Sequence, residues 1–199
     1  FEYGKETRTD VSLKVIADHA RSVTVMISDG ILPSNEGRGY VMRRLLRRAV
    51  RHGRLLGIEK AFLVDIVDVV AEIFRQPYPD IAEKSDYIKK VIQMEETRFS
   101  ETLAQGTELL NQQIEELIAD GGTVLDGAIT FKLYDTFGFP WELTEEMLSE
   151  QGLTLDKAGF DRAMVEQRER ARAARHESET AVVIPDLSGI GTDKLRSDP

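Results

Sequence analysis

Between residues 85 and 120, apolar side chains recur at spacings of three, four and seven residues, which is the pattern of one face of a long helix. The stripe consists of Ile88, Ile92, Phe99, Leu103, Leu110, Ile114 and Leu117. Glu95 and Gly106 interrupt it, and two consecutive glycines follow its end. We predict a single long helix over about residues 85–120, which packs along another helix and exposes its charged face to solvent.

Helical patterns also account for most of the remaining chain. Six further helices are predicted, in about residues 10–27, 38–52, 59–74 and 127–136, after Thr144, and in 156–176. Asp10 is expected to cap the first of these helices, and Gly53 to end the second. The predicted fold class is therefore all-α: an irregular helical bundle with one long helix and little or no β structure.

The second of these helices divides into two faces. Its apolar residues fall on one half of the helical circumference and its arginines on the other. Seven arginines and no acid occur between positions 38 and 54: Arg38, Arg43, Arg44, Arg47, Arg48, Arg51 and Arg54. The whole chain has a formal net charge of −9, so this positive patch lies within an acidic remainder.

The arginine face needs anions, because like charges three or four residues apart cost about 0.2 to 0.5 kcal/mol per pair in an isolated helix. Carboxylates from neighbouring helices could supply them, since the rest of the chain is strongly acidic. Phosphate groups could also supply them, since the guanidinium fork matches phosphate geometry. The residues alone leave both interpretations open.

The sequence argues against several other classes of function. It contains no cysteine and only three histidines, so disulfides are excluded and a zinc site within the chain is not expected. It has no phosphate-binding loop ending in Gly-Lys-Ser/Thr and no Gly-x-Ser-x-Gly motif. His19 is expected to be a packing residue, and the adjacent carboxylates at 95–96 and 145–146 are expected to lie in solvent. We predict no catalytic residue and no metal ligand.

The composition also bears on location. No apolar run approaches the roughly 18 residues of a membrane span, and no charged-then-apolar leader opens the chain. With 31% charged residues, the chain is expected to be soluble and cytoplasmic, without a membrane partner. The first residue is Phe1 rather than methionine, and we expect the chain to be an excised piece of a longer protein.

Three segments resemble a known family in the same order. The stretch VIADHARSVTVMISDGILPSNEGRGYVMRRLLRRAVRHG, Val15 to Gly53, is similar to the signature of alanyl-tRNA synthetases. FKLYDTFGFPWELT, from Phe131, resembles a second block of that family, and AGFDRAMVEQRERAR, from Ala158, resembles it more weakly. The resemblance extends from about residue 11 to residue 175 and is least distinctive between residues 57 and 123.

The resemblance implies which part of such an enzyme the chain represents. Alanyl-tRNA synthetases ligate alanine to tRNA with ATP, and a helical tRNA-recognition domain follows their class II catalytic domain and precedes an editing domain. We expect residues 1–177 to be the helical tRNA-recognition domain and residues 178–199 to be a linker toward the editing domain. By itself the chain should not aminoacylate. It should need no cofactor, since ATP, Mg and Zn belong to the parent enzyme's other domains.

The resemblance also implies the partner, the acceptor stem of tRNA(Ala), and two residues that read it. The family identifies its tRNA by a G·U wobble pair, whose guanine 2-amino group and uracil O4 are left without partners in the pair. The matching positions are Asn35 and Asp135. From the residues alone, Asn35 would be a turn or cap residue and Asp135 a cap or an arginine partner. The candidates for backbone contacts are Arg38, Arg43, Arg44, Arg47, Arg48 and Arg51.

Two other functions compete with this interpretation. The first helix, the Pro-Ser-Asn-Glu-Gly turn and the arginine helix could form a DNA-binding unit similar to a helix-turn-helix, although the turn is longer than usual and no DNA partner is expected. Alternatively, the chain could be a structural helical spacer whose arginines are all paired internally.

Overall fold

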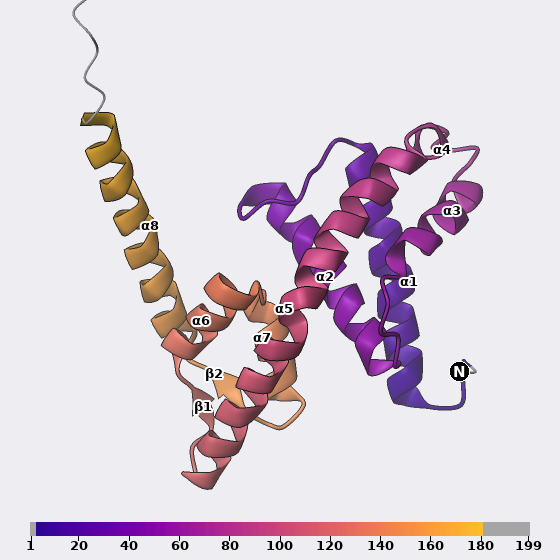
Figure 1. Cartoon of the computed structure of the whole chain (residues 1–199). Helices are drawn as coiled ribbons and strands as arrows, with labels where there is room; N and C mark the ends of the chain where they lie inside the picture. Colours follow the sequence, from indigo (N-terminus) through magenta and orange to yellow (C-terminus); the bar gives the residue numbers. More distant parts are fainter. Residues whose placement is uncertain (1–2, 181–199) are drawn as a thin grey trace, which may run out of the picture.

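The computed structural model describes residues 3–180, which form eight helices and two short strands (Figure 1). The helices are α1 (Thr7–Ser28), α2 (Gly37–Leu55), α3 (Leu63–Ile73), α4 (Asp80–Glu83), α5 (Ser85–Ala119), α6 (Gly127–Phe137), α7 (Trp141–Ser149) and α8 (Lys157–Thr180). The strands are β1 (Val124–Leu125) and β2 (Thr154–Leu155). The predicted all-α fold class is confirmed.

The long helix α5 connects the two halves of the molecule. Helices α1–α4 surround its first part, and α6, α7 and the strands lie beside its last part (Figure 1). Its bounds agree with the prediction, and the apolar stripe is buried except for Leu117, which is half-buried. Other elements approach α5 at the two interruptions of the stripe. Glu95 accepts hydrogen bonds from α2, and Gly106 leaves room for the ring of Phe139.

The first half of the fold is built on the helix pair α1 and α2, which the loop 29–36 joins. Their buried apolar side chains include Ile16, Val23 and Ile27 from α1 and Met42, Leu46 and Val50 from α2. Gly30 has φ +82° just after α1, a left-handed conformation that glycine adopts without strain. The loop that carries Asn35 is therefore anchored at both ends by packed helices.

The second half joins three helices with a minimal sheet. β1 and β2 run parallel, with Val124 opposite Thr154, and α6 packs against the first turns of α8. Asp126 caps α6, because its side chain accepts a hydrogen bond from the backbone N–H of Ala128. Beyond these contacts α8 projects away from the rest of the molecule (Figure 1).

Several predicted helix ends were wrong. Asp10 is not the cap of α1, which starts three residues earlier at Thr7; its carboxylate instead accepts a hydrogen bond from the backbone N–H of Gly4. Gly53 does not end α2 but lies inside it, buried where the ring of Phe62 leaves no room for a Cβ atom. At the C-terminal end, α8 continues to Thr180, and the rest of the predicted 178–199 linker lies outside the described residues.

We predict that Gly106→Ala destabilises the fold, although alanine is normally the better helix former by up to about 1 kcal/mol. A Cβ atom at this position would lie 2.5 Å from the Phe139 ring and 3.0 Å from Phe137 Cβ. We expect overpacking to lower the free energy of unfolding by about 1 to 3 kcal/mol in urea titrations. The exposed neighbour Gln105→Ala is the control and should change it by less than about 0.5 kcal/mol. Stabilisation by Gly106→Ala would contradict the close approach of Phe139.

Candidate nucleic-acid interface

The arginine face of α2 meets a row of glutamates formed by two residues of α7 and its C-cap residue, Glu150. The pairs are Arg44–Glu142, Arg48–Glu146 and Arg51–Glu150, with nitrogen–oxygen distances of 2.7, 2.8 and 2.8 Å. We call these three ion pairs the α2–α7 ladder. Both rows repeat about every four residues, so each lies along one side of its helix. Internal carboxylates therefore neutralise half of the arginines that we considered as phosphate contacts.

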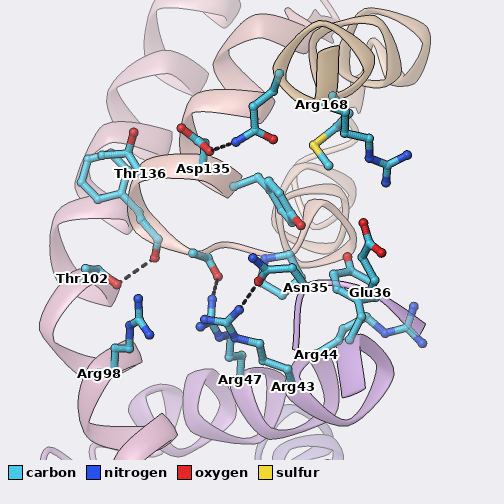
Figure 2. A pocket seen from close by; sticks show the side chains of 17 residues that line it. Asn35, Glu36, Arg43, Arg44, Arg47, Arg98, Thr102, Asp135, Thr136 and Arg168 are labelled. Carbon is cyan, nitrogen blue, oxygen red and sulfur yellow. Dashed lines mark hydrogen bonds between the residues drawn. The ribbon is translucent and has the colours of Figure 1, made fainter. Parts of the chain in front are cut away.

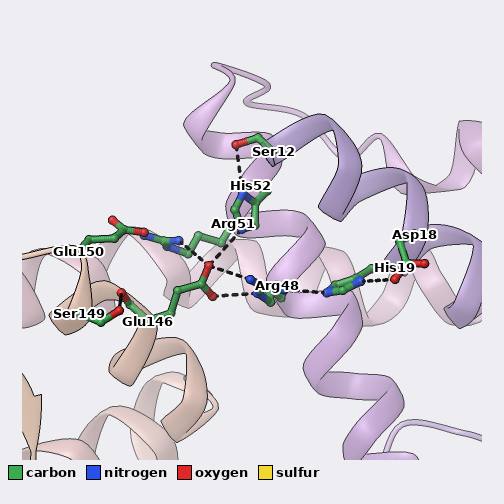
Figure 3. Close-up of polar contacts among 9 residues, drawn as sticks. All are labelled: Ser12, Asp18, His19, Arg48, Arg51, His52, Glu146, Ser149 and Glu150. Atoms are coloured by element: carbon green, nitrogen blue, oxygen red, sulfur yellow. Dashed lines mark hydrogen bonds and ion pairs between the residues drawn. The ribbon is translucent and has the colours of Figure 1, made fainter. Parts of the chain in front are cut away.

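Glu146 lies at the centre of this ladder (Figure 3). Arg48 donates to both of its carboxylate oxygens, and His52 Nε2 lies 3.3 Å from Oε1. Burial alone would raise the pKa of Glu146, but the hydrogen bonds from His52 and Arg48 and the charges of Arg48 and Arg51 outweigh it and lower the pKa to about 2. The carboxylate is thus held ionised in a half-buried position.

The histidines beside the ladder are packing residues. His52 is buried, and its other ring nitrogen lies 3.0 Å from the hydroxyl oxygen of Ser12 (Figure 3). His19 is buried between Asp18 and Arg48, with ring nitrogens 3.2 Å from each, and burial lowers its pKa. The interpretation of His19 as a packing residue agrees with this placement.

A second group of arginines shares one carboxylate on α5. The Nε atoms of Arg43 and Arg47 donate to the same oxygen of Glu95, at 2.7 and 2.8 Å. Arg47 also donates to the backbone carbonyl of Gly138, and its guanidinium carbon lies 5.0 Å from the centroid of the Phe99 ring. Arg47 and Glu95 are buried, with 5% and 7% of their surface exposed. This contact joins α2, α5 and the turn between α6 and α7.

The expectation that the adjacent carboxylates lie in solvent was wrong for three of the four. Glu95 and Glu146 form the ion pairs described above. Glu96 is buried and accepts hydrogen bonds from the backbone N–H groups of Phe62 and Leu63 at the start of α3. Burial raises the pKa of Glu96, although these N–H groups oppose the shift. Only Glu145 is exposed as expected.

Asn35 and Asp135 lie in one cleft, although 100 positions separate them in the sequence (Figure 2). The cleft has a volume of about 520 Å³ and is lined by residues of the α1–α2 loop, α2, α5, α6 and α8. Both side chains are exposed. The fold thus brings the two residues that were singled out for base-pair contact to a common concave surface.

Each of the two has one side-chain oxygen engaged and one polar atom left over (Figure 2). Arg43 donates to Asn35 Oδ1, which leaves the Asn35 amide nitrogen as a donor. Gln167 on α8 donates to Asp135 Oδ1, which leaves Oδ2 as an acceptor. The cleft therefore presents one amide donor and one charged acceptor, each oriented by a neighbour.

The six arginines proposed as backbone contacts occupy three kinds of place. Arg43, Arg44 and Arg47 line the cleft but are paired with glutamates. Arg48 and Arg51 belong to the α2–α7 ladder and do not line the cleft. The sixth, Arg38, is exposed in the first turn of α2 and has no ion pair or hydrogen bond among residues 3–180.

Sequence reasoning missed other residues of the cleft, namely Arg98 on α5 and Gln167 and Arg168 on α8. Each lies within a polar stretch of a helix, so local sequence does not distinguish it from the solvent-exposed charged residues beside it. The α2–α7 ladder, by contrast, is indicated by a spacing pattern in the sequence. The glutamates at 142, 146 and 150 repeat every four residues and thereby complement the arginine row.

The family described as tRNA synthetases class II (A) matches residues 1–191, which is nearly the whole chain. The chain belongs to this family. Among curated relatives, the alanine–tRNA ligase of Alkaliphilus oremlandii (strain OhILAs) is 58% identical over 193 residues, covering 97% of this chain and 22% of that protein. The alanine–tRNA ligase of Thermoanaerobacter sp. (strain X514) is 55% identical over 195 residues, with 98% and 22% covered. The resemblance to alanyl-tRNA synthetases is confirmed.

The chain spans about a fifth of the length of the curated relatives it matches. Within the described part of the chain, no group of three or more histidine, aspartate or glutamate side chains is placed to hold a metal ion. No helix among residues 3–180 combines the length and apolar character that a membrane crossing requires.

We predict that Glu146→Gln lowers the free energy of unfolding at pH 7 by about 1 to 3 kcal/mol, because it removes charge-assisted hydrogen bonds. The folded-state pKa of Glu146, about 2, lies below the ordinary value of 4.5. Its stabilising contribution is therefore present above pH 4.5 and is lost as the pH falls toward 2. Urea titrations at several pH values should show the difference from wild type shrinking in this range.

Glu145→Gln is the matched control for this experiment, because it makes the same chemical change at the exposed neighbouring position. It should change the free energy of unfolding by less than about 0.5 kcal/mol at every pH. A difference between Glu146→Gln and wild type that is independent of pH would contradict an ionised, stabilising Glu146.

Proposed function

We propose that this chain is the part of an alanine–tRNA ligase that recognises the acceptor stem of its tRNA. The observation that carries the proposal is the meeting of Asn35 and Asp135 in one cleft. Two groups that contact the same base pair must face a common space. Residues 100 positions apart in the sequence meet this condition only because the fold brings them together. The kinship with alanine–tRNA ligases supports the choice of tRNA as partner.

In the proposed contact, Asn35 and Asp135 read a G·U wobble pair. The guanine 2-amino group lies in the wide, shallow minor groove of A-form RNA, where a carboxylate accepts its hydrogen bond. The free oxygen of Asp135 suits this role, because the other oxygen is engaged by Gln167. Uracil O4 on the opposite edge requires a donor, and Arg43 leaves the Asn35 amide nitrogen available. In a G·C pair the guanine 2-amino group is hydrogen-bonded to cytosine, and cytosine has no O4.

The structure does not favour the DNA-binding alternative. A recognition helix must place an open face in the major groove. The arginine face of α2 instead packs against α5 and α7 through the ion pairs with Glu95 and the α2–α7 ladder. These internal pairs agree in part with the spacer alternative, but they do not account for the exposed cleft and its oriented polar groups.

We place the chemistry of aminoacylation outside this chain. No catalytic residue is assigned here, and the described side chains offer no three-ligand cluster for a metal ion. ATP, Mg and Zn would then be bound by other parts of the full-length ligase, and this region would position the tRNA for them.

The test is a titration of the chain with acceptor-stem RNA duplexes that differ only by a G·U or a G·C pair, together with a DNA duplex. A single hydrogen bond to a charged group contributes about 1.5 to 3 kcal/mol, so the G·U stem should bind at least about tenfold more tightly. Equal affinity for both RNA stems would contradict base-pair reading. Tighter binding of DNA would favour the DNA-binding alternative, and no binding at low salt would favour the spacer.

We predict that Asp135→Asn removes most of the preference for G·U, because the amide loses the charge and one acceptor. The ratio of the two affinities should fall below about threefold, while binding of the G·C stem changes little. Asp120→Asn, the same change at the exposed end of α5 outside the cleft, is the control and should leave the ratio unaltered. An unchanged ratio in Asp135→Asn would overturn the assignment of Asp135.

A further inference from the structure

The arginines of α2 are poorly placed to supply the affinity for RNA. Five of the six candidates already have carboxylate partners in the fold. A phosphate that approached them would have to compete with these carboxylates, and Arg47 and Arg51 are buried besides. Base-edge contacts by two residues provide selectivity but little affinity, which in nucleic-acid binding comes largely from phosphates. The sixth, Arg38, does not line the cleft, so other cations should hold the backbone there.

Two arginines outside α2 meet this requirement. Arg98 extends from α5 and Arg168 from α8, and both line the cleft that contains Asn35 and Asp135 (Figure 2). Both side chains are exposed. Neither forms an ion pair or a hydrogen bond with any other residue that the structure describes. Their guanidinium groups are therefore available at the cleft without the loss of an internal contact.

The wall that carries Arg98 has an excess of positive charge. Arg43 and Arg47 share the single carboxylate of Glu95, and Arg98 adds a third guanidinium nearby. Burial is the main cause that lowers the pKa of Arg47, and the positive charges of Arg43 and Arg98 act in the same direction against Glu95. Positive charge that is not neutralised and borders a concave surface attracts anions.

The wall that carries Arg168 is arranged so that this arginine stays free. Its neighbour in the chain, Gln167, donates a hydrogen bond to Asp135, so the Asp135 carboxylate is not paired with an arginine. Tyr134 lies close to Arg168, and burial raises the pKa of this phenol although the charge of Arg168 opposes the shift. The phenol thus stays neutral and does not neutralise Arg168.

We propose that Arg98 and Arg168 bind backbone phosphates of the RNA that enters the cleft, on the two sides of the base pair contacted by Asn35 and Asp135. This inference rests on the proposed function, because it takes acceptor-stem RNA as the occupant. In A-form RNA the two strands flank a wide minor groove, so cations on opposite walls of a cleft can each meet one strand. The guanidinium fork binds a phosphate through two parallel hydrogen bonds.

Arg98→Gln and Arg168→Gln test the proposal in the 199-residue chain. Binding of the G·U and G·C acceptor-stem RNA duplexes is measured by fluorescence anisotropy between about 50 and 200 mM salt. Each variant should weaken both duplexes by the same factor, up to about eightfold at 0.1 M salt, and should reduce the slope of log K against log salt by about 0.9. Arg98→Lys should retain most of the binding, since an ammonium also attracts phosphate as a point charge.

The controls remove the same charge elsewhere. Arg75→Gln, two residues after the end of α3, and Arg162→Gln on α8 replace exposed arginines that do not line the cleft. Each should change the affinity by less than about twofold, since exposed charges beyond a Debye length are largely screened. Variants of Arg98 and Arg168 that behave like these controls would overturn the proposal, as would a loss confined to the G·U duplex.

The outcomes separate this proposal from the proposed function. If the wild-type chain binds both RNA duplexes equally and the Arg98 and Arg168 variants weaken both, base-pair reading fails while the phosphate contacts stand. If the wild-type chain prefers G·U and these variants bind like the controls, only the phosphate contacts fail. Absence of binding by the wild-type chain at the lowest salt would overturn both.

Discussion

The buried guanidinium of Arg47 joins three parts of the molecule at one point. It donates to Glu95 on α5 and to the carbonyl of Gly138 between α6 and α7, and it lies over the ring of Phe99. Removing either member of a buried ion pair leaves an uncompensated charge, which costs far more than the pair itself contributes. The arrangement of α2, α5 and the α6–α7 turn therefore depends on this contact, and the α2–α7 ladder extends it along the outer part of the same seam.

The positions of the two proposed base-pair readers follow from that seam. Asn35 lies two residues before the start of α2, and Asp135 lies in the last turn of α6, just before the Gly138 turn that Arg47 holds. The arginines of α2 thus build the cleft, whereas Arg98 and Arg168, on two other helices, provide its unpaired positive charge. Arginine thus serves two purposes here, and burial distinguishes them. A guanidinium inside the fold needs a carboxylate partner, whereas one at the rim of the cleft can bind an external anion.

Periodicity predicted the long helix α5 and the all-α class, because a sustained apolar stripe specifies a helix without knowledge of its partners. It could not explain the interruptions of that stripe. Glu95 looked like a solvent residue because the arginines that bury it lie 52 and 48 positions away, on α2. Gly53 looked like a stop because the ring of Phe62 that requires it cannot be placed from local sequence. Family resemblance singled out Asn35 and Asp135, but only tertiary structure could show that they share a cleft.

Asp135 is held by the neutral amide of Gln167 and by none of the arginines around the cleft. A neutral partner fixes one carboxylate oxygen but leaves the negative charge in place. On the proposed function, the cleft then repels phosphate at Asp135 as well as at the exposed carboxylate of Glu36. A duplex displaced by one base pair would present the Asp135 charge with a base edge that lacks a free exocyclic amine, which leaves the carboxylate unpaired. Misplaced RNA would dissociate quickly, so correct register would be selected by residence time as well as by affinity.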